Sequence, residues 1–110
     1  MKRLSALSIR QPHAERILSG IKPIEYRPRP TSKRERIYIY ASNTPAAPKF
    51  WRQVGLKPGD LPTGLLVGTV EIIDCRYRNG EYEWHLAKPK RLKRSIKPKK
   101  HPQPSWFFPF

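Results

Sequence analysis

The chain has 110 residues, the size of one small domain, and 37% of them are apolar. It carries 23 Lys and Arg against 8 Asp and Glu, a formal net charge of +15. These carboxylates are too few to build surface ion-pair networks, so the charge favours a polyanionic partner, above all nucleic acid, over a merely solvated basic surface. The single cysteine, Cys75, excludes an internal disulfide. With no apolar signal segment and no run long enough to span a bilayer, we expect a cytoplasmic protein without a membrane partner.

The first third of the chain predicts two strands around a short helix. Leu4 to Arg10 mixes apolar and small polar residues and predicts a strand that ends at Gln11-Pro12. Proline suits the first turn of a helix, and Gly20 can take the left-handed conformation that closes one. The apolar face of this helix of about two turns is Ala14, Ile17 and Leu18. Ile24 to Arg27 predicts the second strand.

A basic loop, a strand and a second short helix follow. Pro28 to Arg34 predicts the loop, because prolines and hydroxyl residues disfavour regular structure. Arg36 to Ala41 alternates strictly, so Ile37, Ile39 and Ala41 share one face of a predicted strand. Phe50, Trp51 and Val54 have helical spacing before Gly55.

The second half predicts a hairpin and a basic tail. From Leu65 to Ile73, apolar residues occupy both odd-numbered and even-numbered positions, which indicates a strand buried on both faces. Asn79-Gly80 predicts a hairpin turn before a return strand, Tyr82 to Leu86. No acidic residue follows Glu83, and a further edge strand is expected around Ile96. The chain ends in a cluster of aromatics, of which we expect Trp106 to fold back over the sheet.

Together these elements predict a mainly β (α+β) fold. About five or six short strands with two short helices favour a small, strongly bent or closed sheet, with helices at its openings. We expect one domain over residues 1–110, with a basic, proline-rich C-terminal segment from about 88 to 110. This single domain is expected to be a monomer.

Several polar residues are candidates for a site. Lys22 follows the first helix, where it either caps free carbonyls or serves a site. Glu25 and Arg27 share a strand face and, with Arg10, could form a buried ion pair. Glu71 interrupts an apolar strand, so it must face a wet cavity or be paired. It is either a base or orienting group beside Lys22, or a structural partner of Arg10 or Arg27.

Other residue types carry weaker signals. Ser8 and Ser42 are candidate hydroxyls near strand ends, and Tyr38 and Tyr40 could stack unpaired bases beside Arg36. Core packing is the expected role of Trp84. The histidines have no ligand spacing and no glycine-rich phosphate loop is present, so we expect no metal and no cofactor. Both predicted helices are short and neither is basic, which disfavours duplex reading by a recognition helix.

In four blocks, the sequence resembles the ASCH domain family. These blocks are Leu7-Ser8-Ile9-Arg10-Gln11-Pro12, Gly20-Ile21-Lys22-Pro23-Ile24-Glu25-Tyr26-Arg27, Leu61-Pro62-Thr63-Gly64 with Val67-Gly68-Thr69-Val70-Glu71, and Trp84-His85-Leu86-Ala87-Lys88-Pro89-Lys90-Arg91-Leu92. The resemblance implies a PUA-like β-barrel flanked by helices and an RNA-related function in a cleft lined by the Gly-x-Lys-x-x-Glu block. Some members of the family are ribonucleases.

One branch of the family hydrolyses acetylated cytidine, using a Lys, a Thr three positions later and a Glu on a later strand. By position Lys22 and Glu71 match this triad, but Glu25 stands in place of the Thr. An acyl-enzyme route needs a primed nucleophile, so this departure counts against that route. The chain also departs near its last strand, where Lys99-Lys100-His101-Pro102-Gln103-Pro104 replaces a Gly-rich turn.

The resemblance and the charge therefore predict an RNA-binding ASCH-type protein, with ribonuclease activity as its possible chemistry. The alternatives are an amidohydrolase for an acetylated cytidine nucleoside and a non-catalytic basic protein that stabilises a ribonucleoprotein. The candidate catalytic residues are Lys22, Glu25 and Glu71. The candidate RNA-binding residues are Arg10, Arg27, Tyr40, Ser42, Arg29, Lys33 and Arg34.

Overall fold

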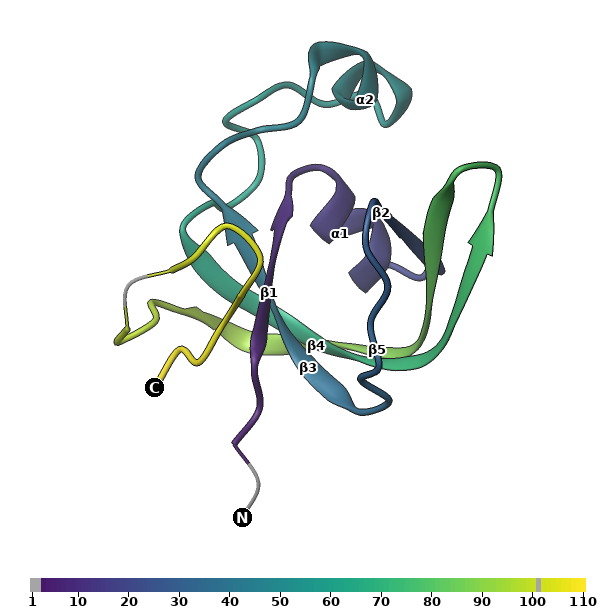
Figure 1. Ribbon diagram of the computed structural model, residues 1–110. Coiled ribbons are helices and arrows are strands. Elements are labelled where there is room, and N and C mark those ends of the chain that lie inside the picture. The colour runs from purple at the N-terminus through teal and green to yellow at the C-terminus, as the bar shows by residue number, and fades with distance from the viewer. Residues whose placement is uncertain (1–2, 101) are drawn as a thin grey trace.

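One curved, six-stranded sheet dominates the computed structural model, which describes residues 3–100 and 102–110 (Figure 1). The strand order is β2-β5-β4-β3-β1-β6, and the pairs are antiparallel except for the parallel pair β1–β3. The elements are β1 (Ala6–Arg10), α1 (His13–Leu18), β2 (Ile24–Arg27), β3 (Arg36–Ser42), α2 (Pro48–Gln53), β4 (Leu65–Arg78), β5 (Glu81–Ile96) and β6 (Trp106–Phe107). Neither helix of the described chain has the length and apolar character required to cross a membrane.

The predicted mainly β class with two short helices is confirmed, but the expected closed barrel is corrected to an open sheet. β2 and β6 are the two edges of this sheet. Proline lacks a backbone N–H and restricts the residue before it, and Pro23 and Pro28 flank the four residues of β2. β2 is therefore too short to continue the sheet, and side chains span the opening toward β1.

The hairpin of β4 and β5 is longer than the sequence predicts. It turns at Asn79-Gly80, as predicted, and both residues have positive φ. The expected separate strand around Ile96 is instead the end of β5, where Ile96 pairs with Leu66. A register shift between Thr69 and Glu71 sets two residues of β5, Lys88 and Pro89, against the single residue Val70 of β4, with Lys88 at φ 51°. This bulge accommodates a proline that would otherwise interrupt the ladder.

The main core lies on the face of the sheet that α1 covers. The predicted apolar face of α1 is buried there, together with Leu7, Ile9, Ile37, Ile39 and Val70. Gly68 lets the helix approach, because a Cβ on this residue would press on Leu18 and lie 2.7 Å from the Lys90 carbonyl oxygen. This close packing fixes α1, and hence the segment that follows it, against the sheet.

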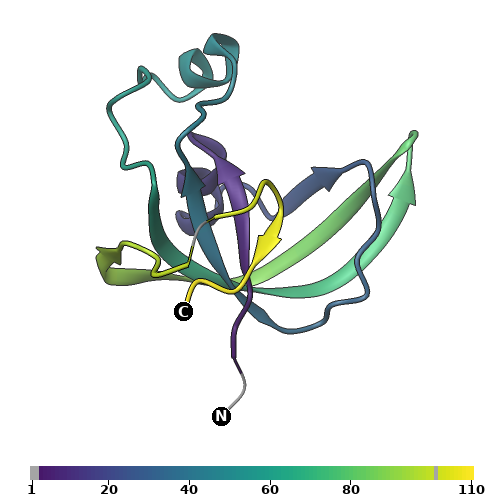
Figure 2. The same cartoon turned by 60° about the vertical axis from the view of Figure 1, so that its left-hand side comes forward.

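The C-terminal aromatics return to the sheet as expected. Leu7 pairs with Trp106, and the Ser8 amide donates to the Ser105 carbonyl at 2.9 Å. Trp106 packs on the main core, whereas Phe107 is buried on the other side of the sheet against Tyr40. Figure 2 shows this yellow segment beside β1.

Candidate functional site

The end of α1 directs Lys22 toward β2. Gly20 has φ +82°, and the amides of Ile21 and Lys22 both donate to the Arg16 carbonyl at 3.0 Å. This is the helix closure predicted from the glycine, and it uses backbone groups that a helix end leaves free. Lys22 therefore leaves the helix in a fixed direction and lies over the start of β2.

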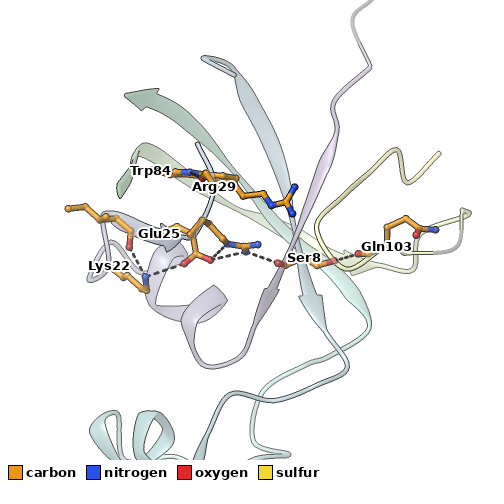
Figure 3. Close-up of polar contacts among 8 residues, drawn as sticks. Ser8, Lys22, Glu25, Arg29, Trp84 and Gln103 are labelled. Atoms are coloured by element: carbon orange, nitrogen blue, oxygen red, sulfur yellow. Dashed lines mark hydrogen bonds and ion pairs between the residues drawn. The ribbon is translucent and has the colours of Figure 1, made fainter. Parts of the chain in front are cut away.

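Glu25 is a buried carboxylate held between two cations. It is 8% exposed. The Lys22 ammonium donates to Glu25 Oε1 at 3.2 Å, and Arg27 Nε donates to Oε2 at 2.9 Å. Lys22 also donates to the Ile24 carbonyl at 2.6 Å. Figure 3 shows Lys22 and Glu25 turned toward one another. Because Lys22 and Arg27 each donate to a different oxygen, both oxygens of the Glu25 carboxylate accept a hydrogen bond.

The same cluster spans the opening between β2 and β1. Arg27 Nη2 donates to the Ser8 carbonyl at 2.9 Å, and the Ser8 hydroxyl donates to the Gln103 carbonyl at 2.7 Å. A row of polar contacts thus runs from Lys22 to Gln103 in the C-terminal segment (Figure 3). The predicted ion pair of Glu25 with Arg27 is present, but Arg10 is exposed and does not join it. Ser8 connects the cluster to the C-terminal segment.

A cavity of about 450 Å³ lies over this row. The parallel pairing of β1 with β3 places Arg10 opposite Ser42, so both strands end at the cavity. The lining residues are Ser8, Arg10, His13, Glu25, Arg27, Ser42, Thr44 and Pro104. The lining has two cations, Arg10 and Arg27, and Lys22 lies behind Glu25, the single carboxylate of the lining. This excess of positive charge suits an anionic or strongly polar ligand.

His13 is the residue of this cavity that sequence reasoning missed. Burial lowers its pKa from the ordinary value of 6.5, and the charge of Lys22 lowers it further, against the opposing effect of Glu25. Its Nδ1 is buried and has no hydrogen-bond partner within residues 3–100 and 102–110. The ring packs edge-on against Phe50 at 4.7 Å. The one available signal was its position just beyond Arg10, where the predicted strand ends.

Glu71 does not join Lys22 and Glu25. Its carboxylate lies 3.5 Å from the Arg36 guanidinium. The register between β3 and β4 places these two residues opposite one another. Its neighbours Val70 and Ile72 enter the core, so Glu71 projects from the other face. Glu71 thus has a structural arginine partner, but both named alternatives are wrong: the partner is Arg36, and neither Arg10 nor Arg27 pairs with it.

Of the remaining predicted binding residues, Ser42 lines the main cavity and the others lie outside its lining. Tyr40 is buried against Phe107 and borders two smaller cavities, one of which also includes Ser42. Arg29 lines a separate cavity, and Lys33 lies 5.0 Å from the ring centre of Trp106. Arg34 donates to the carbonyls of Thr31 and Lys33, so it holds the loop together.

The buried cluster predicts unequal effects of removing two carboxylates. Glu25→Gln leaves Lys22 and Arg27 partly buried without a counter-charge, and we expect it to lower the free energy of unfolding by about 1.5–3 kcal/mol. Glu71→Gln breaks only a half-exposed pair and should cost less than about 1 kcal/mol. Urea unfolding of both variants measures the difference. Equal losses would contradict a structural role for the Glu25 cluster.

The lowered pKa of His13 predicts a pH-dependent stability. The unfolded chain takes up the proton near pH 6.5, whereas folded His13 takes it up only at lower pH, so stability should fall as the pH drops through that window. NMR titration should give His13 a pKa below 6.5. Lys22→Met should raise this pKa, because it removes a nearby positive charge, whereas Lys93→Met on the exposed part of β5 should leave it unchanged. A His13 pKa at or above 6.5 would contradict the burial argument.

Comparison with known proteins gives the chain a family. The ASCH domain model matches residues 7–107. "Activating signal cointegrator 1" of Homo sapiens and that of Mus musculus are each 35% identical over 80 residues, which is 63% of this chain and 14% of each relative. The chain thus spans about a seventh of these curated relatives. It belongs to the ASCH domain family.

Proposed function

We propose that this protein binds single-stranded RNA, with the cavity over the Lys22–Glu25–Arg27 cluster as its selective site. The main support is the cationic excess of that cavity. Arg10 is exposed at its rim, and no carboxylate of the described residues pairs with this guanidinium. Guanidinium groups bind phosphate in a bidentate manner, and the serine and threonine hydroxyls of the lining can bind sugar or base edges.

A basic surface continues from the cavity along the C-terminal segment. The main cavity shares Ser8 and Ser42 with a smaller one, which in turn shares Tyr40 and Asn43 with a third. The third cavity includes Lys97, Lys99 and Lys100. Among the cations of residues 88–100, Arg91 is paired with Glu15, and the others are exposed. This path offers successive phosphates a series of unpaired cations.

The helices favour single strands over duplex DNA as the partner. α1 and α2 have six residues each. A helix that reads the major groove presents several side chains to base edges, and neither helix is long enough for this. RNA is recognised mainly where its bases are unpaired. The proposal therefore rests on a single-stranded segment that enters the cavity and continues along the basic path.

Binding to a labelled single-stranded RNA should weaken as salt rises. The logarithm of the affinity should fall by roughly 0.7 per neutralised phosphate for each decade of salt. Arg10→Gln should weaken binding about tenfold or more, because it removes a charged contact at the cavity. Arg78→Gln, at the end of the β4–β5 hairpin, removes the same charge and should have a much smaller effect. Fluorescence anisotropy measures each case.

Two results would contradict this proposal in different ways. A salt-independent affinity would exclude phosphate recognition by the basic surface. Binding that ignores Arg10→Gln and Lys22→Ala, but is lost when Lys97, Lys99 and Lys100 are neutralised, would favour the non-catalytic ribonucleoprotein-stabilising alternative. Charge substitutions are preferable to truncation, because removal of the C-terminal segment would also remove β6 from the sheet.

RNA cleavage is a second candidate function, favoured by His13. Its lowered pKa keeps the imidazole neutral at pH 7, so the ring can accept a proton. A ribose 2′-hydroxyl placed beside it would lose that proton as its oxygen attacks the adjacent phosphorus. The 5′-oxygen would then leave with a proton from solvent, giving a cyclic phosphate. Arg10 and Arg27 would stabilise the charge on the phosphorane.

A denaturing gel of labelled RNA tests cleavage. We expect wild type to cut the RNA and His13→Ala to lose at least about 100-fold in rate, because it lacks the base. Lys22→Ala should also be slow, since Glu25 and Arg27 lose their support. His85→Ala is the matched control, because His85 lies by Glu83 on β5. Intact RNA with wild type would exclude the nuclease and leave the binding proposal in place.

No comparable observation favours hydrolysis of acetylated cytidine. The position of the required Thr is occupied by Glu25, whose two oxygens are held by cations. The second carboxylate of that triad, Glu71, is paired with Arg36 on another face. These residues do not assemble the nucleophile and base that an acyl-enzyme route needs.

A further inference from the structure

A second cavity, of about 540 Å³, adjoins the main one and contains a tryptophan pair. Arg27 belongs to the lining of both cavities. The second cavity is bordered by Trp84, Trp106, Arg27, Pro28, Arg29 and Pro30. Figure 3 shows Trp84 and Arg29 beside the polar row that includes Glu25 and Ser8. A ligand in the main cavity therefore has this second space directly beside it.

The two indoles form a fixed aromatic platform. Their ring centres are 5.8 Å apart and their planes differ by 14°. Trp84 is 4% exposed, and its indole N–H donates to the Arg29 carbonyl at 3.0 Å. Trp106 is half-buried and is held in register with Leu7 on β1. The polar edge of Trp84 is satisfied, so Trp106 supplies the accessible aromatic surface.

Cations surround this platform. The Arg27 guanidinium lies 5.6 Å from the ring centre of Trp84, and the Lys33 ammonium 5.0 Å from that of Trp106. The lining of this cavity includes no carboxylate among the described residues. Lys33 pairs with Glu35, whose carboxylate lies 3.9 Å from the Lys33 ammonium. An aromatic face within reach of several cations has the chemistry of a nucleotide site, because the base can stack while its phosphate binds the cations.

We propose that this cavity binds the base of the nucleotide next to the one in the main cavity, with that base stacked on Trp106. This inference rests on the proposed binding of single-stranded RNA and assigns a second subsite to it. Arg27 would contact the backbone between the two nucleotides. Core packing accounts for the contact of Trp106 with Trp84, but it does not require the open, cation-lined space. A proline-rich peptide would also fit an aromatic groove, yet it would bring no anion to a cavity whose lining has two guanidinium groups and no carboxylate among the described residues.

The test uses a short, labelled oligoadenylate RNA and the full chain. Trp106→Ala should weaken binding roughly 5- to 100-fold, the effect of losing one stacked base, whereas Trp106→Phe should retain most of the affinity. Phe108→Ala is the matched control, because Phe108 is an exposed aromatic of the same segment outside this cavity. Circular dichroism and thermal unfolding establish that each variant is folded.

A measurement on wild-type protein keeps the proposal testable even if Trp106→Ala unfolds. Oligoadenylates with an abasic nucleotide at successive positions should show one position at which affinity falls by the same factor. At that position Trp106→Phe should add no further loss. Unchanged affinity at every abasic position, with a normal salt response, would overturn the stacking subsite alone. No RNA binding at any salt concentration would overturn the proposed function as well. A polyproline peptide that displaces the RNA from Trp106 and binds more tightly than it would overturn the nucleotide assignment.

Discussion

The buried ion pairs of Glu25 connect the open edge of the sheet to the rest of the fold. β2 pairs with β5 on one side, and toward β1 the described structure has side-chain contacts in place of a backbone ladder. Arg27 provides this link while it is neutralised by Glu25. Removing these charges from water is costly, and close geometry with additional hydrogen bonds to carbonyls offsets that cost. The same residues line the cavity, so the contacts that hold the edge also shape the site.

Local spacing predicted one part of this cluster, the pairing of Glu25 with Arg27. It did not predict the contact of Lys22 with Glu25, because Lys22 was expected beside Glu71. A glycine closes α1, Lys22 follows at once, and two-residue alternation puts Glu25 and Arg27 on one face of β2. Glu71 was harder to place, because its partner depends on the register between β3 and β4, which sets Arg36 opposite it. A strand pattern gives the two faces of a strand but not the residue across from each position. The apolar residues Val70 and Ile72 on either side of Glu71 did indicate, by strand alternation, that Glu71 points away from the core.

His13 and Trp106 depend on contacts between distant parts of the chain. His13 reaches the cavity because α1 starts where β1 ends, and its pKa is lowered first by burial, then by Lys22, and to a smaller extent by Arg16. Trp106 lies by Trp84 only because β6 joins β1 at the far edge of the sheet. Likewise, the bulge at Lys88-Pro89 lets β5 continue past a proline that reads as a strand end. Sequence patterns indicate burial at such positions, whereas the identity of the contact requires the topology.

The distribution of charge separates two contributions to the proposed RNA binding. The exposed cations of residues 88–100 would attract any phosphate backbone, whatever its base sequence. The cavity, by contrast, has a single carboxylate balanced by fixed cations, hydroxyls and a neutral imidazole, so it can discriminate by hydrogen-bond pattern. Affinity would then come mainly from the exposed cations of residues 88–100, and selectivity from the cavity over the Lys22–Glu25–Arg27 cluster. Because Arg27 borders both the main cavity and the tryptophan cavity, a ligand that fills one also constrains the backbone that enters the other. Selection would accordingly act on adjacent nucleotides rather than on a single base.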